Sequence, residues 1–238
     1  MLIHTIFDFL AWISGAAAGV FVSKRGWLSS LKTRSPLSNP AYFVVLGLGA
    51  LGGAILFGSL NLDLAGRFNF GHSIAGAIAG GIVAIELFKL TTGIRGSTGA
   101  QFVAPLALGI AVGRWGCFFA GLPDYTYGTA TSLPWGVDFG DGIRRHPVQL
   151  YESFSMLGFL VFYLREISRQ NAFVLRHGFY LFIGFYSLQR FLWEFVKPYP
   201  RVIGPLNVFH LVCLSLFAYS VIMMVKNDEP ALQTVAKL

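Results

Sequence analysis

The amino-acid sequence predicts an all-α protein that crosses a membrane seven times. Of its 238 residues, 55% are apolar or aromatic and only 12% are charged, and the mean hydropathy is +0.62. These values exclude a disordered chain and argue against a water-soluble globule. Seven apolar runs reach about 20 residues, the length that a helix needs to cross the hydrocarbon core of a bilayer. They lie at about 3–22, 41–60, 71–90, 100–120, 149–167, 178–197 and 206–225.

The first run, 3–22, has no basic segment before it and contains Asp8. We therefore expect a retained membrane span, the alternative being a cleaved signal peptide.

The first three runs carry small residues at every fourth position, which allows two helix backbones to approach closely. These are Ala11, Gly15 and Gly19; then Ala50, Ala54 and Gly58, beside Gly49 and Gly53; then Ser73, Ala77 and Gly81, beside Gly76 and Gly80.

The last four runs complete the bundle and leave little chain for a soluble domain. We expect residues 1–238 to form a single integral-membrane domain. The longest segment between runs, 121–148, separates the fourth and fifth spans and is rich in Gly, Asp, Pro and aromatic residues. Loops of this length inside a compact domain are commonly functional.

The distribution of basic residues predicts the orientation, because Lys and Arg are retained on the cytoplasmic side. One side has eleven, namely Lys24, Arg25, Lys32, Arg34, Lys89, Arg95, Arg165, Arg169, Arg176, Lys226 and Lys237. The opposite loops have five, namely Arg67, Arg144, Arg145, Lys197 and Arg201. We expect the N-terminus outside, the C-terminus in the cytoplasm and loop 121–148 on the periplasmic or extracellular side. The net charge of +7 is then an orientation signal and does not indicate a nucleic-acid partner.

Ionisable residues inside the predicted spans are the strongest functional signal. A charge at this depth costs on the order of 3 kcal/mol or more unless it is paired or reaches a wet cavity. Arg114 and Arg190 lie inside spans, and Tyr186, Arg190 and Glu194 are four residues apart on one helix face. The topology gathers further polar residues in the outer third of the bundle. The whole set is His72, Arg114, Arg145, His146, Gln149, Tyr151, Glu152, Arg190 and Glu194.

Two arginines that face one cavity suit an oxyanion, because the guanidinium group presents forked donors and stays protonated. A phospholipid phosphate at the outer headgroup level fits this depth. The alternative is that Arg114 and Arg190 only neutralise Glu152 and Glu194 as structural ion pairs.

Three motifs carry a family resemblance. They are Gly113-Arg114-Trp115-Gly116-Cys117-Phe118-Phe119-Ala120-Gly121, then Arg145-His146-Pro147-Val148-Gln149-Leu150-Tyr151-Glu152, then Tyr186, Arg190 and Glu194. In this order they resemble prolipoprotein diacylglyceryl transferase, from about residue 72 to 198. The Arg-His-Pro-x-Gln-Leu-Tyr-Glu block is the most specific element.

The resemblance implies transfer of the diacylglyceryl group of phosphatidylglycerol to the thiol of a lipobox cysteine in a prolipoprotein signal peptide. Glycerol 1-phosphate is released, and no cofactor or metal is expected. The family's two essential arginines fall on Arg114 and Arg190, its tyrosine on Tyr186 and its histidine on His72. Either His72 or His146 could accept the thiol proton. We favour His72, because Pro147 suits a structural turn.

The resemblance also implies a multi-pass protein of the bacterial plasma (inner) membrane, with its active site facing the outer leaflet. We assign headgroup binding to the arginines and their polar neighbours, and we expect a monomer in contact with membrane lipids. The headgroup-binding set is Arg114, Arg145, His146, Gln149, Tyr151, Glu152, Arg190 and Glu194.

The chain departs from the family pattern beside the first arginine. Cys117, Ala120 and Leu122 stand where two amides and an acid are usual, and His72 is followed by Ser73-Ile74 instead of two glycines. The alternatives are a paralogue with another acceptor, or a non-enzymatic binder or transporter of phospholipids or anionic solutes.

Four further residues receive structural interpretations. We expect Cys117 to behave as a small buried apolar residue, the alternative being a reactive thiol near the site. We expect Asp124 to be a solvated turn residue, the alternative being contact with a polar substrate. We expect His210 and Tyr199 to be interfacial residues, although His210 could also line the cavity. Two cysteines without a paired motif predict neither a metal site nor a disulfide framework.

Overall fold

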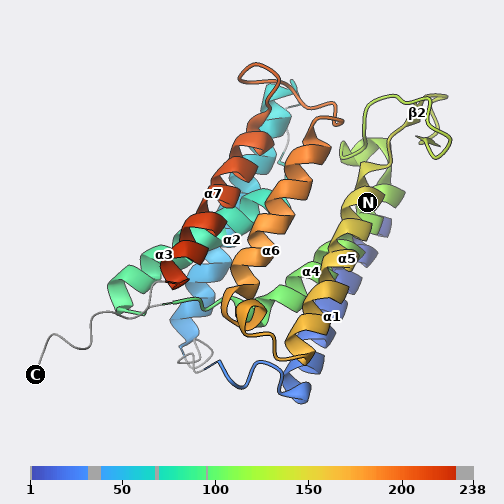
Figure 1. Ribbon diagram of the computed structural model, residues 1–238. Helices are drawn as coiled ribbons and strands as arrows, with labels where there is room; N and C mark the ends of the chain where they lie inside the picture. The colour runs from blue at the N-terminus through green and yellow to red at the C-terminus, as the bar shows by residue number, and fades with distance from the viewer. Residues whose placement is uncertain (1, 32–38, 68–69, 95, 229–238) are drawn as a thin grey trace, which may run out of the picture.

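The computed structural model describes residues 2–31, 39–67, 70–94 and 96–228, and within them it contains seven long helices (Figure 1). The first four are α1 (Leu2–Arg25), α2 (Pro40–Leu64), α3 (Ile74–Thr92) and α4 (Val103–Ala120). The last three are α5 (Val148–Ser168), α6 (Ala172–Glu194) and α7 (Val208–Asp228). Each predicted span thus corresponds to one helix. Of the basic residues used to predict orientation, Lys32, Arg34, Arg95 and Lys237 lie outside the described residues.

Helix α6 differs most from its predicted bounds, since it begins six residues earlier and ends three residues earlier than 178–197. Its N-cap residue is Asn171, whose side-chain oxygen accepts the backbone N–H groups of Phe173 and Val174. This cap fixes the helix start although the first turns include Arg176 and His177, which interrupt the apolar run. The cap at Asn171, and not the hydropathy of the segment, therefore determines where α6 begins.

Short elements flank α4 and occupy the segment after it. The 3-10 turn η2 (Ala100–Phe102) leads into α4, and η3 (Leu122–Asp124) follows it. Strands β1 (Val137–Asp138) and β2 (Arg144–Arg145) then pair antiparallel, with Val137 opposite Arg145. The side chain of Asp138 accepts three backbone N–H groups in the turn between the strands.

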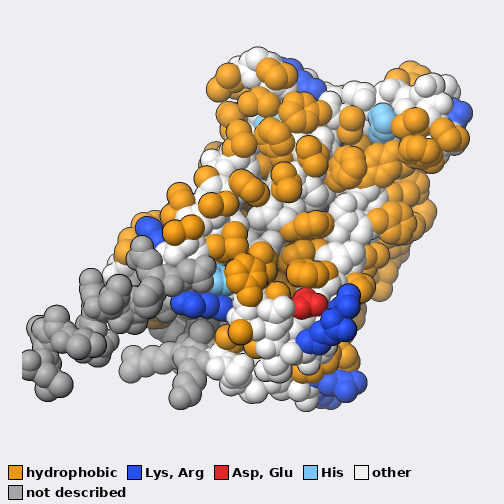
Figure 2. Space-filling view, viewed as in Figure 1, with side chains coloured by type: hydrophobic (Ala, Val, Ile, Leu, Met, Phe, Trp, Pro, Cys, Tyr) orange, Lys and Arg blue, Asp and Glu red, His pale blue; other side chains and the backbone are white. Residues whose placement is uncertain are grey.

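Five helices are long and apolar enough to cross a membrane. They are α1, α2, α3, α4 with η2, and α7. Helices α5 and α6 have similar lengths of 21 and 23 residues but a more polar composition. Large apolar side chains on α1 and α2 are exposed, including Trp12 at 79% and Leu48 at 67%. Figure 2 shows this kind of surface, with hydrophobic side chains over the middle of the visible face and Lys or Arg toward its two ends. Such a surface suits contact with lipid.

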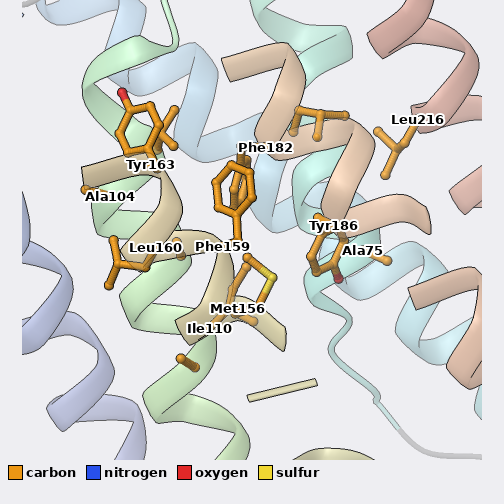
Figure 3. Packing of buried hydrophobic residues seen from close by; sticks show 14 of the residues in the cluster. Ala75, Ala104, Ile110, Met156, Phe159, Leu160, Tyr163, Phe182, Tyr186 and Leu216 are labelled. Carbon is orange, nitrogen blue, oxygen red and sulfur yellow. The ribbon is translucent and has the colours of Figure 1, made fainter. Parts of the chain in front are cut away.

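The helices pack mainly as α1 with α4, α2 with α3, α4 with α5, and α6 with α7. The segments between α4 and α5 and between α6 and α7 lie at the upper end of the bundle in Figure 1, and the connection between α5 and α6 lies at the lower end. The buried core lies among α4, α5, α6 and α7. Figure 3 shows Met156 and Phe159 of α5 beside Phe182 and Tyr186 of α6.

The contact between α2 and α3 confirms the small-residue pattern. A Cβ atom on Gly53 would overlap the carbonyl oxygen of Gly76, and one on Gly80 would overlap the carbonyl oxygen of Gly49. The backbones touch because these positions carry no side chain. In the same way, Gly15 of α1 packs against the backbone of Pro105 in α4.

This packing predicts that Gly53→Ala destabilises the protein by about 1–3 kcal/mol, because the added methyl group must push two helices apart. The matched control is Gly52→Ala, whose Cβ would have no neighbour within 4 Å. We expect thermal unfolding in detergent to show a lower Tm for Gly53→Ala and no loss for Gly52→Ala. Equal Tm values would contradict the close contact.

Candidate active site

Five charged side chains form a buried ion network in the upper part of the bundle, with members from α4, α5, α6 and the segment after α6. All are buried, with exposed fractions of 7% or less. The network consists of Arg114, Glu152, Arg190, Glu194 and Lys197.

Glu152 is the centre of the network, because three cations contact its carboxylate. Arg190 Nη1 donates to Oε1 at 2.6 Å, and Lys197 Nζ donates to the same oxygen at 2.8 Å. The second oxygen, Oε2, forms an ion pair with the Nε of Arg114. A buried carboxylate needs such partners, since burying it alone would cost several kcal/mol.

Glu194 forms the second half of the network. Its Oε1 lies 2.7 Å from Arg190 Nε and 3.5 Å from Lys197 Nζ. Its Oε2 accepts the side-chain N–H of Asn207 at 3.0 Å. Asn207 is held in turn by His210, whose Nδ1 accepts the Asn207 backbone N–H at 3.0 Å. The segment before α7 is thereby tied to the end of α6.

The charges of the network do not cancel. Arg114, Arg190 and Lys197 contribute three positive charges, and Glu152 and Glu194 contribute two negative ones. The arginines do form the structural pairs with both glutamates that the alternative interpretation requires. Burial and the neighbouring Arg190 lower the pKa of Lys197, while Glu152 and Glu194 oppose this shift. The protonated Lys197, which donates to Glu152, leaves one positive charge in excess among buried groups. Such an excess favours an anionic ligand.

Hydrogen bonds between segments hold the helices that carry the network against one another. Ser153, next to Glu152, donates its hydroxyl to the backbone oxygen of Ala111 at 2.7 Å, which fixes α5 against α4. Across the upper end, Tyr125 donates to the carbonyl oxygen of Pro198 at 2.9 Å. The Thr129 backbone N–H donates to the backbone oxygen of Val196 at 2.6 Å. The segment between α4 and α5 therefore covers the end of α6.

Helix α6 presents a polar stripe at helical spacing toward the interior. Tyr186, Gln189, Arg190, Trp193 and Glu194 lie on this stripe. The hydroxyl of Tyr186, both amide atoms of Gln189 and the indole N–H of Trp193 are buried without a hydrogen-bond partner in the described part of the chain. Buried polar groups usually have partners, so this stripe offers donors and an acceptor to a ligand.

The remaining predicted site residues divide into two groups. Gln149 is fully buried and donates to Thr126 at 3.3 Å. His146 Nδ1 lies 3.3 Å from the hydroxyl of Tyr151, which also accepts the indole N–H of Trp135 at 2.8 Å. These residues border the network through their place at the start of α5.

Arg145 and His72 are not joined to the network. Asp141 holds the Arg145 guanidinium through two hydrogen bonds of 2.6 and 2.7 Å. The same hydrogen bonds lower the pKa of the Asp141 carboxyl. His72 is exposed just before α3, and within the described residues no hydrogen bond or ion pair connects its side chain to the five charged groups.

Sequence reasoning missed three residues around the network. Lys197 was assigned to an outer loop, yet it is 1% exposed. Tyr199 and His210 were predicted to be interfacial, but they are 6% and 0% exposed. Burial raises the pKa of Tyr199 well above its ordinary value. The spacing of Lys197 three residues after Glu194 was the available signal, since such pairs meet across one turn.

The interpretations of Cys117 and Asp124 were also wrong. Cys117 is only partly buried, and its sulfur lies 3.7 Å from His4 Nε2 and 3.9 Å from Arg114 Nη1. The side chain of Asp124 is 16% exposed and lies 3.3 Å from the same His4 nitrogen. Both side chains face polar partners instead of lipid or bulk solvent.

Comparison with known proteins settles the family. The sequence model described as prolipoprotein diacylglyceryl transferase matches residues 9–226, which is most of the chain. The chain belongs to the prolipoprotein diacylglyceryl transferase family. No solved structure matches it.

Relatives in this family align over most of their length. The chain is 31% identical to a phosphatidylglycerol–prolipoprotein diacylglyceryl transferase of Geobacter sulfurreducens, over 91% of this chain and 88% of the relative. A protein of the same description from Aeromonas hydrophila is 32% identical, over 83% of this chain and 72% of the relative. The one from Nitratidesulfovibrio vulgaris is 31% identical, over 87% and 84%.

The network geometry predicts a large stability loss for Glu152→Gln. The substitution removes one of two carboxylates that balance three buried cations, so we expect unfolding to become easier by about 3–5 kcal/mol. Glu166→Gln is the control, because Glu166 pairs only at 3.9 Å with the exposed Arg169, and such pairs contribute at most about 1 kcal/mol. The amide oxygen of glutamine can still accept the 2.8 Å hydrogen bond that Glu166 receives from Asn171. Chemical denaturation in detergent measures both changes, and an equal small effect for the two would contradict the role of Glu152.

Proposed function

We propose that the protein transfers the diacylglyceryl group of phosphatidylglycerol to the lipobox cysteine thiol of a prolipoprotein and releases glycerol 1-phosphate. Membership of the family supports this reaction. The structural observation that supports it best is the excess positive charge of the buried ion network. A phosphodiester headgroup carries one negative charge and would balance it.

The chemistry needs charge stabilisation at the phosphate. The thiolate sulfur forms a bond to the glycerol carbon, while the bond from that carbon to the phosphate oxygen breaks. The leaving phosphate monoester takes the electron pair and gains negative charge. Arg114, Arg190 and Lys197 stabilise that charge, and the buried surroundings strengthen the interaction because few water molecules screen it. In this mechanism the phosphate shares the three cations with Glu152.

The polar stripe on α6 completes the headgroup site. The unpartnered hydroxyl of Tyr186, one turn before Arg190, donates to a phosphate or glycerol oxygen, and Gln149 donates from the start of α5. We assign acceptance of the thiol proton to His72, because His146 is engaged by Tyr151 at the turn before α5. His72 then holds the proton on a side chain that is exposed at the surface of the chain.

We propose that all seven helices cross the bacterial plasma membrane, with the N-terminus outside and the C-terminus in the cytoplasm. The low hydropathy of α5 and α6 comes in part from three charged residues, Glu152, Arg190 and Glu194. These residues are paired with one another inside the bundle and do not face lipid. This supports membrane spans of more polar composition than the other five. The active site then faces the outer leaflet, where phosphatidylglycerol would enter.

The decisive test of the reaction uses purified protein, labelled phosphatidylglycerol and a lipobox peptide. We expect Arg190→Ala to abolish formation of lipid-shifted peptide and glycerol phosphate, while Arg201→Ala, at an exposed arginine of the α6–α7 segment, retains turnover. Absence of product in the folded wild-type protein would refute the proposed transfer. Equal turnover of both variants would remove Arg190 from the site.

Tyr186→Phe separates function from folding. Its hydroxyl makes no hydrogen bond with the described residues, so its removal leaves the stability unchanged or slightly higher. We expect a loss of turnover of at least about tenfold, which is the worth of one hydrogen bond of about 1.4 kcal/mol. Tyr163→Phe is the control. It removes the 3.2 Å hydrogen bond that the Tyr163 hydroxyl donates to the backbone oxygen of Ala100 at the lower end of the bundle, and we expect turnover to persist. Full activity of Tyr186→Phe would exclude headgroup contact.

Single cysteines report the orientation. Ser132→Cys lies on the exposed segment between α4 and α5, and Ser29→Cys lies on the exposed segment after α1. In intact cells whose outer membrane is permeable to the reagent, a membrane-impermeant maleimide should label Ser132→Cys but not Ser29→Cys. The wild-type chain sets the background from Cys117 and Cys213. The reverse labelling pattern would contradict the proposed orientation.

A further inference from the structure

Three potential metal ligands from three separate elements converge beside Arg114. They are His4 of α1, Cys117 of α4 and Asp124 of η3, and their ligand atoms all lie within 4.8 Å of one another. His4 Nε2 is 3.7 Å from Cys117 Sγ and 3.3 Å from Asp124 Oδ1. None of these three residues belongs to the ion network.

Two of the three distances between ligand atoms match those of a tetrahedral zinc site. In such sites zinc lies about 2.0–2.1 Å from nitrogen, 2.3 Å from sulfur and 2.0–2.2 Å from oxygen. With tetrahedral angles at the ion, the nitrogen and sulfur ligand atoms are then about 3.6 Å apart, and the nitrogen and oxygen ligand atoms about 3.4 Å apart. The observed distances of 3.7 and 3.3 Å agree with these values. A thiolate, an imidazole and a carboxylate are the ligand types that Zn²⁺ accepts, and the thiolate disfavours Mg²⁺ and Ca²⁺.

The atoms around the ligands support the same assignment. His4 Nδ1 lies 2.8 Å from the carboxylate of Asp8, one turn along α1. A carboxylate on the far nitrogen is the usual way in which a protein orients a metal-binding imidazole. The second oxygen of Asp124 accepts the hydroxyl of Thr126, which holds the carboxylate in place. The non-ligating atoms of His4 and Asp124 therefore already have partners.

We propose that His4, Cys117 and Asp124 bind one Zn²⁺ ion with a fourth position open to an exogenous ligand. The thiolate and the carboxylate balance the double charge of the ion. Within the described part of the chain, no fourth His, Cys, Asp or Glu joins this group. Three protein ligands with one open position are typical of zinc sites that bind water or a substrate. The 3.9 Å contact between Arg114 Nη1 and Cys117 Sγ places the ion beside the ion network.

Metal content tests the site without reference to lipid transfer. The full chain carries a tag without histidines at its C-terminus, is produced in zinc-supplemented medium and is purified without chelators. Mass spectrometry of the metals should find about one zinc per chain. Cys117→Ser and Asp124→Asn should each lose it, whereas the control Cys213→Ser, at a buried cysteine of α7, retains it.

Cobalt provides a second readout that needs no variant. Co²⁺ added to chelator-treated wild-type protein should produce the thiolate charge-transfer absorption and tetrahedral d–d bands, and Zn²⁺ should displace them. Cys117→Ser should lack the charge-transfer absorption. Folded wild-type protein that contains less than about a tenth of an equivalent of zinc and shows no cobalt spectrum would overturn the proposal. So would zinc retention by both Cys117→Ser and Asp124→Asn.

Discussion

Glu152 accepts contacts from Arg114, Arg190 and Lys197 in the buried interior of the bundle. A carboxylate in this position is stable only if cations surround it, and each cation needs its own support. Helices α4, α5 and α6 are therefore held in one arrangement at their upper ends. Glu194 and Asn207 extend the same constraint to α7.

The excess of one positive charge connects this constraint to the reaction. A balanced network would hold the helices together but would offer nothing to an anion. With three cations and two carboxylates, the site is short of one negative charge, which the phosphate would supply in the function we propose. The unpartnered hydroxyl of Tyr186 on the adjoining turn of α6 indicates where the ligand would complete the hydrogen bonds. In the function we propose, structural pairing and ligand binding would be two properties of the same side chains.

Apolar run length predicted the seven helices because bilayer thickness fixes the number of residues that a span requires. It misplaced the start of α6, since the cap at Asn171 outweighs the polar Arg176 and His177. The membrane penalty on charge identified Arg114, Glu152, Arg190 and Glu194 as a group. Lys197 was missed because it follows the end of α6 and resembles a loop residue in sequence.

Contacts between distant segments were outside the reach of local patterns. His4 and Cys117 are 113 residues apart, and no ligand spacing within a segment indicates that they meet. The contact of Arg145 is local but was also not predicted: Arg145 belongs to the specific Arg-His-Pro block, and Asp141, four residues earlier, holds its side chain. Only the packing of α1 against α4 and the pairing of β1 with β2 decide these partners.

Equilibrium binding of phosphatidylglycerol to Lys197→Met tests the excess charge most directly. This variant keeps both arginines and both glutamates but makes the network neutral. With the protein in nanodiscs, we predict that phosphatidylglycerol affinity falls at least about tenfold, or about 1.4 kcal/mol, while affinity for uncharged diacylglycerol is unchanged. Wild-type affinity for phosphatidylglycerol in the folded variant would contradict the central role of the excess positive charge.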